Sequence, residues 1–309
     1  MGGKLVVSSV RQADDVALVA NVLQQLRLLL KLALDYCQKF NVQLCPSKTK
    51  LLVVQPKGSN NIFIPCNSIK MGNNYVDFTS TAEHVAVIRS IEGNMPNLLM
   101  RISSFKKALG FVLFCGLARG SRKNPAVAVR IVNVYATPVL MSGLASLVLS
   151  KKEVSSLDQQ YKRTLQNILK LSVSSPRSLV HFVAGSLPAT AILHLRQISL
   201  FSMICHLSEN PLYEHAQNVL HTSSLSRHSW FLQISDILLI YQLPYPFILL
   251  ANPPKKEAFK KLVKARVIDY WEQILRAEAS YLPSLIHFKS QYCSLTKPHK
   301  LWTFSVGNS

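Results

Sequence analysis

Residues 5–20 read LVVSSVRQADDVALVA, in which two apolar runs flank a short polar turn that carries Asp14 and Asp15. Because valine is enriched in strands, two such runs around a polar turn predict a β-hairpin. Adjacent carboxylates at its tip stay hydrated enough to ionise, and Mg²⁺ takes oxygen ligands of this kind. Asp14 and Asp15 are therefore candidate catalytic, magnesium-binding residues. The alternative is an ordinary turn, since aspartate favours turns for its own backbone hydrogen bonds.

The residues after this hairpin predict a helix over 21–39, then a loop and a strand over 50–54. Short strands are expected over 62–69 and 75–78, around a Gly72-Asn73-Asn74 turn. Apolar side chains recur at helical spacing along one side of the helix and predict a stripe that packs on a sheet: Leu23, Leu26, Leu30, Ala33, Leu34 and Cys37.

The order of these segments resembles the second half of the palm of a reverse transcriptase from LINE-type, non-LTR retrotransposons. An Ala13-Asp14-Asp15 hairpin is followed by a helix, by Ser47-Lys48-Thr49-Lys50 and by a strand. The resemblance covers nearly the whole chain, because it continues through residues 82–90, 93–96, 116–125, 135–145, 193–197 and 294–299.

The resemblance implies an α+β, predominantly α-helical fold: a truncated palm of β-hairpin, helix and short strands, followed by helical parts. It places the carboxy-terminal half of the palm in residues 1–97, a helical thumb in 98–175 and a helical connector region in 176–309. It further implies that Lys48 lies near the incoming triphosphate. Arg89 would contact a phosphate, because it lies in a strand and turn that resemble the primer grip of the family. A solvated lysine before a strand is the alternative for Lys48.

The chain also departs from the family. Gln12 stands where the family has an aromatic residue, and the family's first catalytic aspartate lies on an upstream strand that this chain lacks. A site for two metal ions ~3.5–4 Å apart needs carboxylates from that upstream strand as well as from the hairpin that carries Asp14 and Asp15. We therefore expect a reverse-transcriptase fragment that is inactive as encoded, unless the missing amino-terminal half of the polymerase is supplied in trans. The alternative is a nucleic-acid-binding relic, or a module retained by the host, without polymerase activity.

The net charge points to the same class of partner. Lysine and arginine number 35 against 15 acidic residues, which gives a formal charge of +20 and a pI near 9.9. Such an excess favours polyanions, so we expect RNA and DNA as partners through the template–primer backbone. Ribosomes and acidic membranes also attract basic proteins. The hydrophobic fraction of 49% argues against disorder.

Residues 98–117 predict an apolar helix with Arg101, Lys106 and Lys107 on what would be one face. Asn124 and Pro125 suit the first positions of another helix. The free N–H groups of that helix would lie beside cations and form an anion site for backbone phosphates, unless the segment is a solvated basic loop. The cations are Arg119, Arg122 and Lys123.

Two later helices carry further candidates for nucleic-acid binding. Ser150-Lys151-Lys152-Glu153 is a capping-box pattern that opens a helix through Leu171, with Lys162 and Arg163 on its surface. The last long helix, over 254–280, is basic at one end and could face nucleic acid, an acidic membrane or water. Its candidate residues are Lys260, Lys261 and Lys264.

The six cysteines form no C-x-x-C pair, and we find no signal peptide. Together these features predict buried, reduced thiols in an intracellular protein, cytoplasmic or nuclear. Residues 132–149 come nearest to a membrane span, but Asn133, Pro138 and Gly143 interrupt the apolar run. We expect a buried core helix there, no transmembrane segment and no membrane partner.

Overall fold

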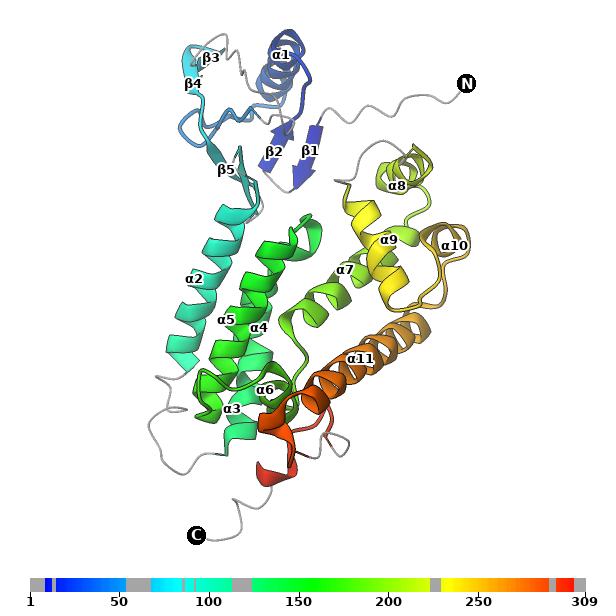
Figure 1. Ribbon diagram of the computed structural model, residues 1–309. Helices are drawn as coiled ribbons and strands as arrows, with labels where there is room; N and C mark the ends of the chain where they lie inside the picture. The colour runs from blue at the N-terminus through cyan, green and yellow to red at the C-terminus, as the bar shows by residue number, and fades with distance from the viewer. Residues whose placement is uncertain are drawn as a thin grey trace. The chain divides into compact units, whose positions relative to one another are not determined.

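The computed structural model describes residues 9–12, 15–53, 68–84, 87–91, 93–112, 124–222, 229–288 and 293–302. The fold is α+β and predominantly helical, as predicted, and the chain divides into two compact units, Met1–Asn97 and Leu98–Ser309 (Figure 1). The division falls at the predicted end of the palm-like part. The second unit spans both the predicted thumb and the predicted connector region, because helices pack on one another across residue 175.

Three antiparallel strand pairs form the β structure of the first unit. They are β1 (Ser9–Gln12) with β2 (Asp15–Leu18), β3 (Ser68–Met71) with β4 (Asn74–Asp77), and β5 (Thr81–His84) with β6 (Val87–Ser90). Among the described residues, each sheet has only these two strands. The hairpin prediction for the first stretch is confirmed, but its strands are 9–12 and 15–18. In the described residues 50–53 the strand predicted over 50–54 is wrong, since only Leu51 forms a bridge there, to Phe78, and residue 54 lies outside the described part.

The helix of the first unit, α1 (Leu23–Lys39), covers a small core. Leu30 is buried with Ile69, Met71 and Val76 of the β3–β4 pair. The predicted stripe is confirmed, because Leu30 and Cys37 are buried and four others are half-buried: Leu23, Leu26, Ala33 and Leu34. A second apolar stripe on the same helix stays exposed, and its side chains retain more than half of their accessible surface: Leu28 58%, Leu32 56% and Tyr36 53%.

The β5–β6 hairpin is held by Asn97, near the start of α2 (Met95–Val112). Its side-chain oxygen accepts a hydrogen bond from the backbone N–H of Ile88 at 2.6 Å, and its amide donates to the carbonyl of the same residue. Asn97 is itself buried, so this pair of bonds satisfies a polar side chain that would otherwise be costly inside the fold.

The second unit continues with α3 (Pro125–Ile131), the π-helix η2 (Val132–Ala136), α4 (Thr137–Met141), the 3₁₀ turn η3 (Leu144–Ser146) and α5 (Lys151–Leu169). The single helix predicted over 132–149 is therefore wrong. Pro138 has no N–H for the carbonyl of Val134, and the Thr137 hydroxyl donates to the carbonyl of Val132 at 3.2 Å, so the helix widens at this point. Burial of the segment is confirmed in large part, although Val134 and Tyr135 are exposed.

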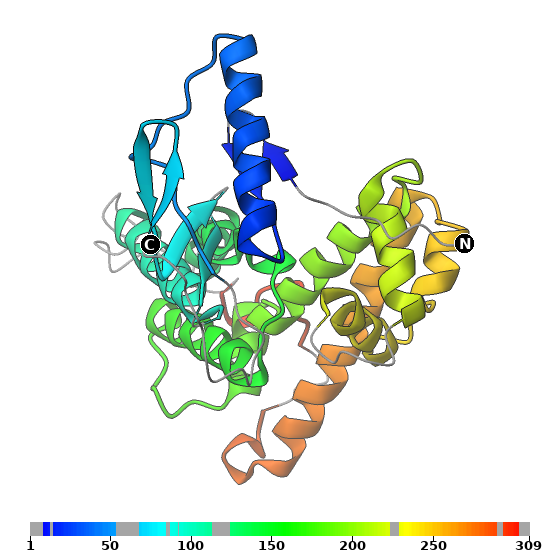
Figure 2. The same ribbon diagram turned by 90° about the horizontal axis from the view of Figure 1, so that it is seen from above.

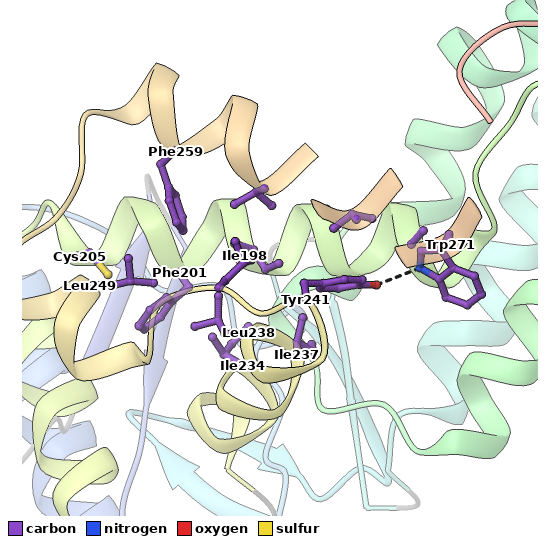
Figure 3. Close-up of a cluster of buried hydrophobic side chains, with 14 of the residues drawn as sticks. Ile198, Phe201, Cys205, Ile234, Ile237, Leu238, Tyr241, Leu249, Phe259 and Trp271 are labelled. Carbon is purple, nitrogen blue, oxygen red and sulfur yellow. Dashed lines mark hydrogen bonds between the residues drawn. The ribbon is translucent and has the colours of Figure 1, made fainter. Parts of the chain in front are cut away.

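The remaining helices include α7 (Ala189–Cys205), which packs against α5, α8 (Pro211–Thr222), α9 (Trp230–Ile240), α10 (Pro246–Ala251) and α11 (Lys256–Tyr281). The others are α6 (Arg177–Ala184) and the 3₁₀ turns η5 (Pro283–Leu285) and η7 (Lys300–Trp302). Figures 1 and 2 show α8, α9 and α10 gathered at one end of α7. Figure 3 shows Ile198 and Phe201 of α7 packed among side chains of α9, α10 and α11, which form the main core.

The segment 293–302 packs against the end of α6. The backbone N–H of His299 and the indole N–H of Trp302 both donate to the carbonyl of Val183, at 3.4 and 3.0 Å. Gly185 has a φ of +60°, and a Cβ at this position would lie 2.3 Å from the backbone of Lys297. The close approach therefore requires glycine here.

No single helix in the described part of the chain is long and apolar enough to cross a membrane. Only α6 and α7 taken together reach that length and composition, and they are bent by 65° at their junction. Most of their apolar side chains are buried in the core of the second unit.

Candidate nucleic-acid interface

The acidic pair predicted to bind metal lies only partly within the described residues. Asp15 begins β2 and is paired in register with Gln12 of β1. Asp14 lies outside the described residues, so the pair cannot be placed as a unit. Within the described ranges, no group of three His, Cys, Asp or Glu side chains could hold a metal ion. The Mg²⁺ site therefore stays a prediction.

Lys48 lies in a tight turn of the first unit. The backbone N–H groups of Lys48 and Thr49 both donate to the carbonyl of Cys45, at 3.2 and 3.0 Å. The Lys48 side chain is exposed, as a phosphate-binding lysine and a solvated lysine both would be. In the same turn the Cys45 thiol lies 3.2 Å from the Ser47 hydroxyl, and this hydrogen bond lowers the pKa of Cys45. Cys45 is exposed, which corrects the prediction that the cysteines are buried.

Arg89 lies on β6, opposite Ala82 of β5, and its side chain is exposed. The expected strand is present as β6, paired with β5, whereas residues 85–86 lie outside the described residues. Of the three cations of α2, Arg101 is half-buried, whereas Lys106 and Lys107 are exposed. Spacings of five and six residues point to different sides of a helix with 3.6 residues per turn, so the prediction of one basic face on α2 is wrong.

The predicted helix start at Asn124 is confirmed. The Asn124 side-chain oxygen accepts a hydrogen bond from the backbone N–H of Ala126 at 2.9 Å, and Pro125 is the first residue of α3. The cations expected beside it, Arg119, Arg122 and Lys123, lie outside the described residues. The anion site at this helix start therefore stays a prediction.

The capping box predicted at the start of α5 is confirmed. Ser150 accepts a hydrogen bond from the backbone N–H of Glu153, whose carboxylate accepts from the Ser150 N–H at 2.7 Å. The helix ends at Leu169, two residues before the predicted end.

Two polar stripes run along α5. One stripe is exposed and contains Lys152, Arg163 and Lys170; the other faces a groove and contains Lys151, Ser155, Asp158 and Lys162.

We call this depression the α5–α9 groove. It has a volume of about 770 Å³, with walls from α5 and α9 and polar side chains of α7 at its floor. Besides the α5 residues, its lining comprises Leu149, Arg177, Thr190, His194, Gln233, Asp236, Ile237 and Ile240. All of these residues belong to the second unit.

A hydrogen-bonded chain fixes the floor of the groove. The Trp271 indole donates to the Tyr241 hydroxyl at 3.0 Å, and this hydroxyl lies 2.7 Å from Nδ1 of His194 (Figure 3 shows the first bond). Burial lowers the pKa of His194 to about 4. His194 is therefore neutral at pH 7 and adds no charge to the groove.

The α5 wall is fixed to α7 by Asp158. Its carboxylate accepts hydrogen bonds from the backbone N–H of Thr190, at 2.8 Å, and from the Thr190 hydroxyl. Burial raises the pKa of Asp158 above its usual value, and the two bonds from Thr190 oppose that rise. Asp158 thus satisfies the free N–H groups at the start of α7, a structural role that leaves its oxygens engaged.

The amino-terminal half of α11 is the most basic stretch in the described residues. Between Lys255 and Arg266 there are six cations and one acidic residue, Glu257, and all seven side chains are exposed. The predicted candidates Lys260, Lys261 and Lys264 belong to this set. Lys255 and Lys256 lie in the first turn, where the helix dipole disfavours a cation, typically by 0.3–1 kcal/mol each. Helix stability therefore does not explain why six cations gather in this stretch.

Sequence reasoning missed the α5–α9 groove, although it identified Lys162. The missing signal was the spacing Lys151, Ser155, Asp158 and Lys162, which repeats every three to four residues and marks a second polar side on α5. Asp236 and His194 could not be connected to it, because they are far away in sequence and only the packing of α9 and α7 on α5 brings them together.

Compared with known proteins, the chain matches no family model, no curated protein and no solved structure. The resemblance to a reverse transcriptase therefore stays a prediction from the residues quoted above.

Proposed function

We propose that this chain is a nucleic-acid-binding fragment of a non-LTR retrotransposon reverse transcriptase, which holds the phosphate backbone and does not polymerise by itself. Three features support the proposal: the resemblance that spans nearly the whole chain, the formal charge of +20, and the exposed cations of the second unit. A polyanion is the partner that such a charge favours.

The observation that carries the proposal is the basic half of α11. Six cations against one acid give this stretch a net charge of +5, and two of them, Lys255 and Lys256, lie in the first turn, where the dipole disfavours positive charge. The ion pairs formed by Glu272 and Glu278 involve Arg276 and Arg177, outside this stretch. A nearby polyanion would offset the repulsion between these cations, and backbone phosphates supply closely spaced negative charges.

The packing of α11 favours nucleic acid over a membrane surface. An amphipathic helix binds a bilayer by burying its apolar face among the acyl chains. In α11 the large apolar side chains next to the lysines, Phe259 and Val263, are already buried against the core, and Leu262 is the only large one of this stretch that is exposed, at 43%. The surface that remains available is therefore the charged one.

Binding to a labelled duplex and to a labelled RNA strand, measured over a range of salt concentrations, tests the proposal. We expect affinity to fall steeply with salt, and the triple variant K260Q/K261Q/K264Q to lower the slope of log K against log salt by ~0.9 for each lost phosphate contact on a duplex. The matched control K31Q/K50Q/K70Q removes three exposed lysines from the first unit. A flat salt response, or equal losses in both triple variants, would contradict the proposal.

Primer extension with Mg²⁺ separates this proposal from a working polymerase. We expect no incorporation by the 309-residue chain alone, because Asp14 and Asp15 supply carboxylates from one hairpin only. Incorporation that disappears in Asp14→Ala would show that another side chain completes the metal site, and the proposed inactivity would be wrong.

A further inference from the structure

The α5–α9 groove contains polar groups that the fold leaves unused. Lys151, Lys162 and Gln159 on α5 and Asp236 on α9 line it, and within the described part of the chain their side chains make no hydrogen bond or ion pair. Asp158 and His194, by contrast, are engaged in fixing the walls and floor. Unused charged groups in a formed depression are available for a ligand.

The two walls of the groove differ in charge. Lys151 and Lys162 lie eleven residues apart on α5, which corresponds to about 16 Å along the helix axis. The facing wall carries the carboxylate of Asp236 beside the apolar side chains of Ile237 and Ile240. A ligand that fits this groove has negative charge along one edge, and hydrogen-bond donors with apolar surface along the other.

We infer that the groove holds a short single-stranded segment of nucleic acid, with its phosphates along α5 and its bases toward α9. This inference rests on the proposed function and narrows it to one form of nucleic acid. A volume of about 770 Å³ lies within the range of small-ligand pockets, ~300–1,000 Å³, which accommodates nucleotides of one strand and not a duplex. Asp236 repels phosphate, so the backbone is held to the lysine side.

The acidic wall also predicts a base preference. A carboxylate accepts a hydrogen bond from the exocyclic amino group of cytosine, whereas thymine presents a carbonyl oxygen at the equivalent position. Asp236 therefore favours cytosine over thymine at the base that reaches it. The apolar side chains of Ile237 and Ile240 contribute contact with the base faces without selecting among them.

Fluorescence anisotropy with labelled oligo(dC), oligo(dT) and a duplex of mixed sequence tests this inference on the full chain. The double variant K151Q/K162Q removes the groove cations, and the control K152Q/R163Q removes the same charge from the exposed stripe of the same helix. We expect the groove variant to weaken oligo(dC) binding about tenfold for each lysine, the usual scale for a charged hydrogen bond. Duplex binding should change equally in the two double variants.

Asp236→Asn provides the second readout, because it removes the negative charge and keeps the size of the side chain. We expect it to abolish the preference for oligo(dC) over oligo(dT), with thermal unfolding unchanged since Asp236 is exposed. Equal losses of oligo(dC) binding in the two double variants, or an unchanged preference in Asp236→Asn, would overturn the inference and leave the proposed function standing. Absence of binding to every nucleic acid by the unmodified chain would overturn both.

Discussion

The two units of the chain bury their apolar surface to different extents. In the second unit α7 is surrounded by neighbouring helices, and side chains such as Phe201 and Leu157 are fully buried. In the first unit the described strands form three separate pairs, and the buried cluster consists of four residues around Leu30. An isolated two-stranded hairpin is marginal at best in water.

The contrast extends to what each unit exposes. The first unit exposes an apolar stripe on α1 that includes Leu28 and Leu32, whereas the second unit exposes the lysines of α5 and α11. The second unit thus has the properties of an independently stable binding module. The first unit obtains little stability from its own core, and we expect it to unfold at lower denaturant concentration.

The largest effect should come from removing core side chains in the two units. Phe201→Ala should cost about 3–5 kcal/mol of the unfolding free energy of the second unit, because the site is closely packed on all sides. Leu30→Ala should cost about 2–3 kcal/mol in the first, whose small cluster can relax. All three tryptophans, Trp230, Trp271 and Trp302, lie in the second unit, so their fluorescence in a denaturant titration reports that unit alone.

Circular dichroism in the same titration reports both units and serves as the comparison signal. Leu30→Ala should move the circular dichroism transition and leave the tryptophan transition in place. If Leu30→Ala moved both transitions equally, the two units would unfold together, and they would not differ in their free energy of unfolding.

A smaller effect should appear as a pH dependence of the second unit. His181 is buried beside Tyr161, and burial lowers its pKa to about 4 from the usual 6.5. Between these values the unfolded chain binds a proton that the folded chain does not, so this residue's contribution to stability falls as pH falls from about 6.5 to 4. Its size is about 3 kcal/mol at pH 4, from 1.36 kcal/mol per pKa unit.

The variant His181→Phe keeps the ring against Tyr161 and removes the titration. Its loss of stability relative to the unmodified chain, measured by denaturant titration at pH 7 and at pH 4, should be smaller at pH 4 by about 3 kcal/mol. His287→Gln changes an exposed histidine and should leave the pH dependence unaltered. Parallel pH profiles for His181→Phe and the unmodified chain would show that His181 is not the source of the effect.

Local signals in the sequence predicted the helix starts well. The Asn124 cap and the Ser150–Glu153 capping box involve residues two or three positions apart, so both partners of each capping bond can be read from one short segment. The end of α4 at Met141 was the exception, because the apolar pattern of 132–149 outweighed Gly143 in the prediction, and this glycine has a φ of +71°. A glycine within an apolar run deserves more weight than its neighbours.

The buried side of α11 could not be predicted from helical periodicity. Its buried residues recur every fourth position: Phe259, Val263, Val267, Trp271, Leu275 and Ala279. A repeat of four in a helix of 3.6 residues per turn rotates by about 40° at each step, which suits a helix that packs on α7 and on α6. Leu262 and Ile274 fall outside this repeat of four, and both are exposed, at 43% and 38%.

The smallest effect is a difference in cysteine reactivity between the two units, and it involves no change in stability. Cys45 in the first unit is exposed with a lowered pKa, because the Ser47 hydroxyl stabilises its thiolate. Burial raises the pKa of Cys205 in the second unit to about 12. Since the thiolate is the reactive form, iodoacetamide at pH 7.5 should modify Cys45 at least about a thousandfold faster than Cys205.

Peptide mass spectrometry of timed samples measures both rates, in a background where Cys66 and Cys115 are replaced by serine. Ser47→Ala removes the hydrogen bond to Cys45 and should slow its modification, whereas Ser155→Ala, an exposed serine of α5, should not. Comparable modification rates at Cys45 and Cys205 would mean that the second unit opens as readily as the first. The second unit could not then be the stable binding module that the burial of α7 indicates.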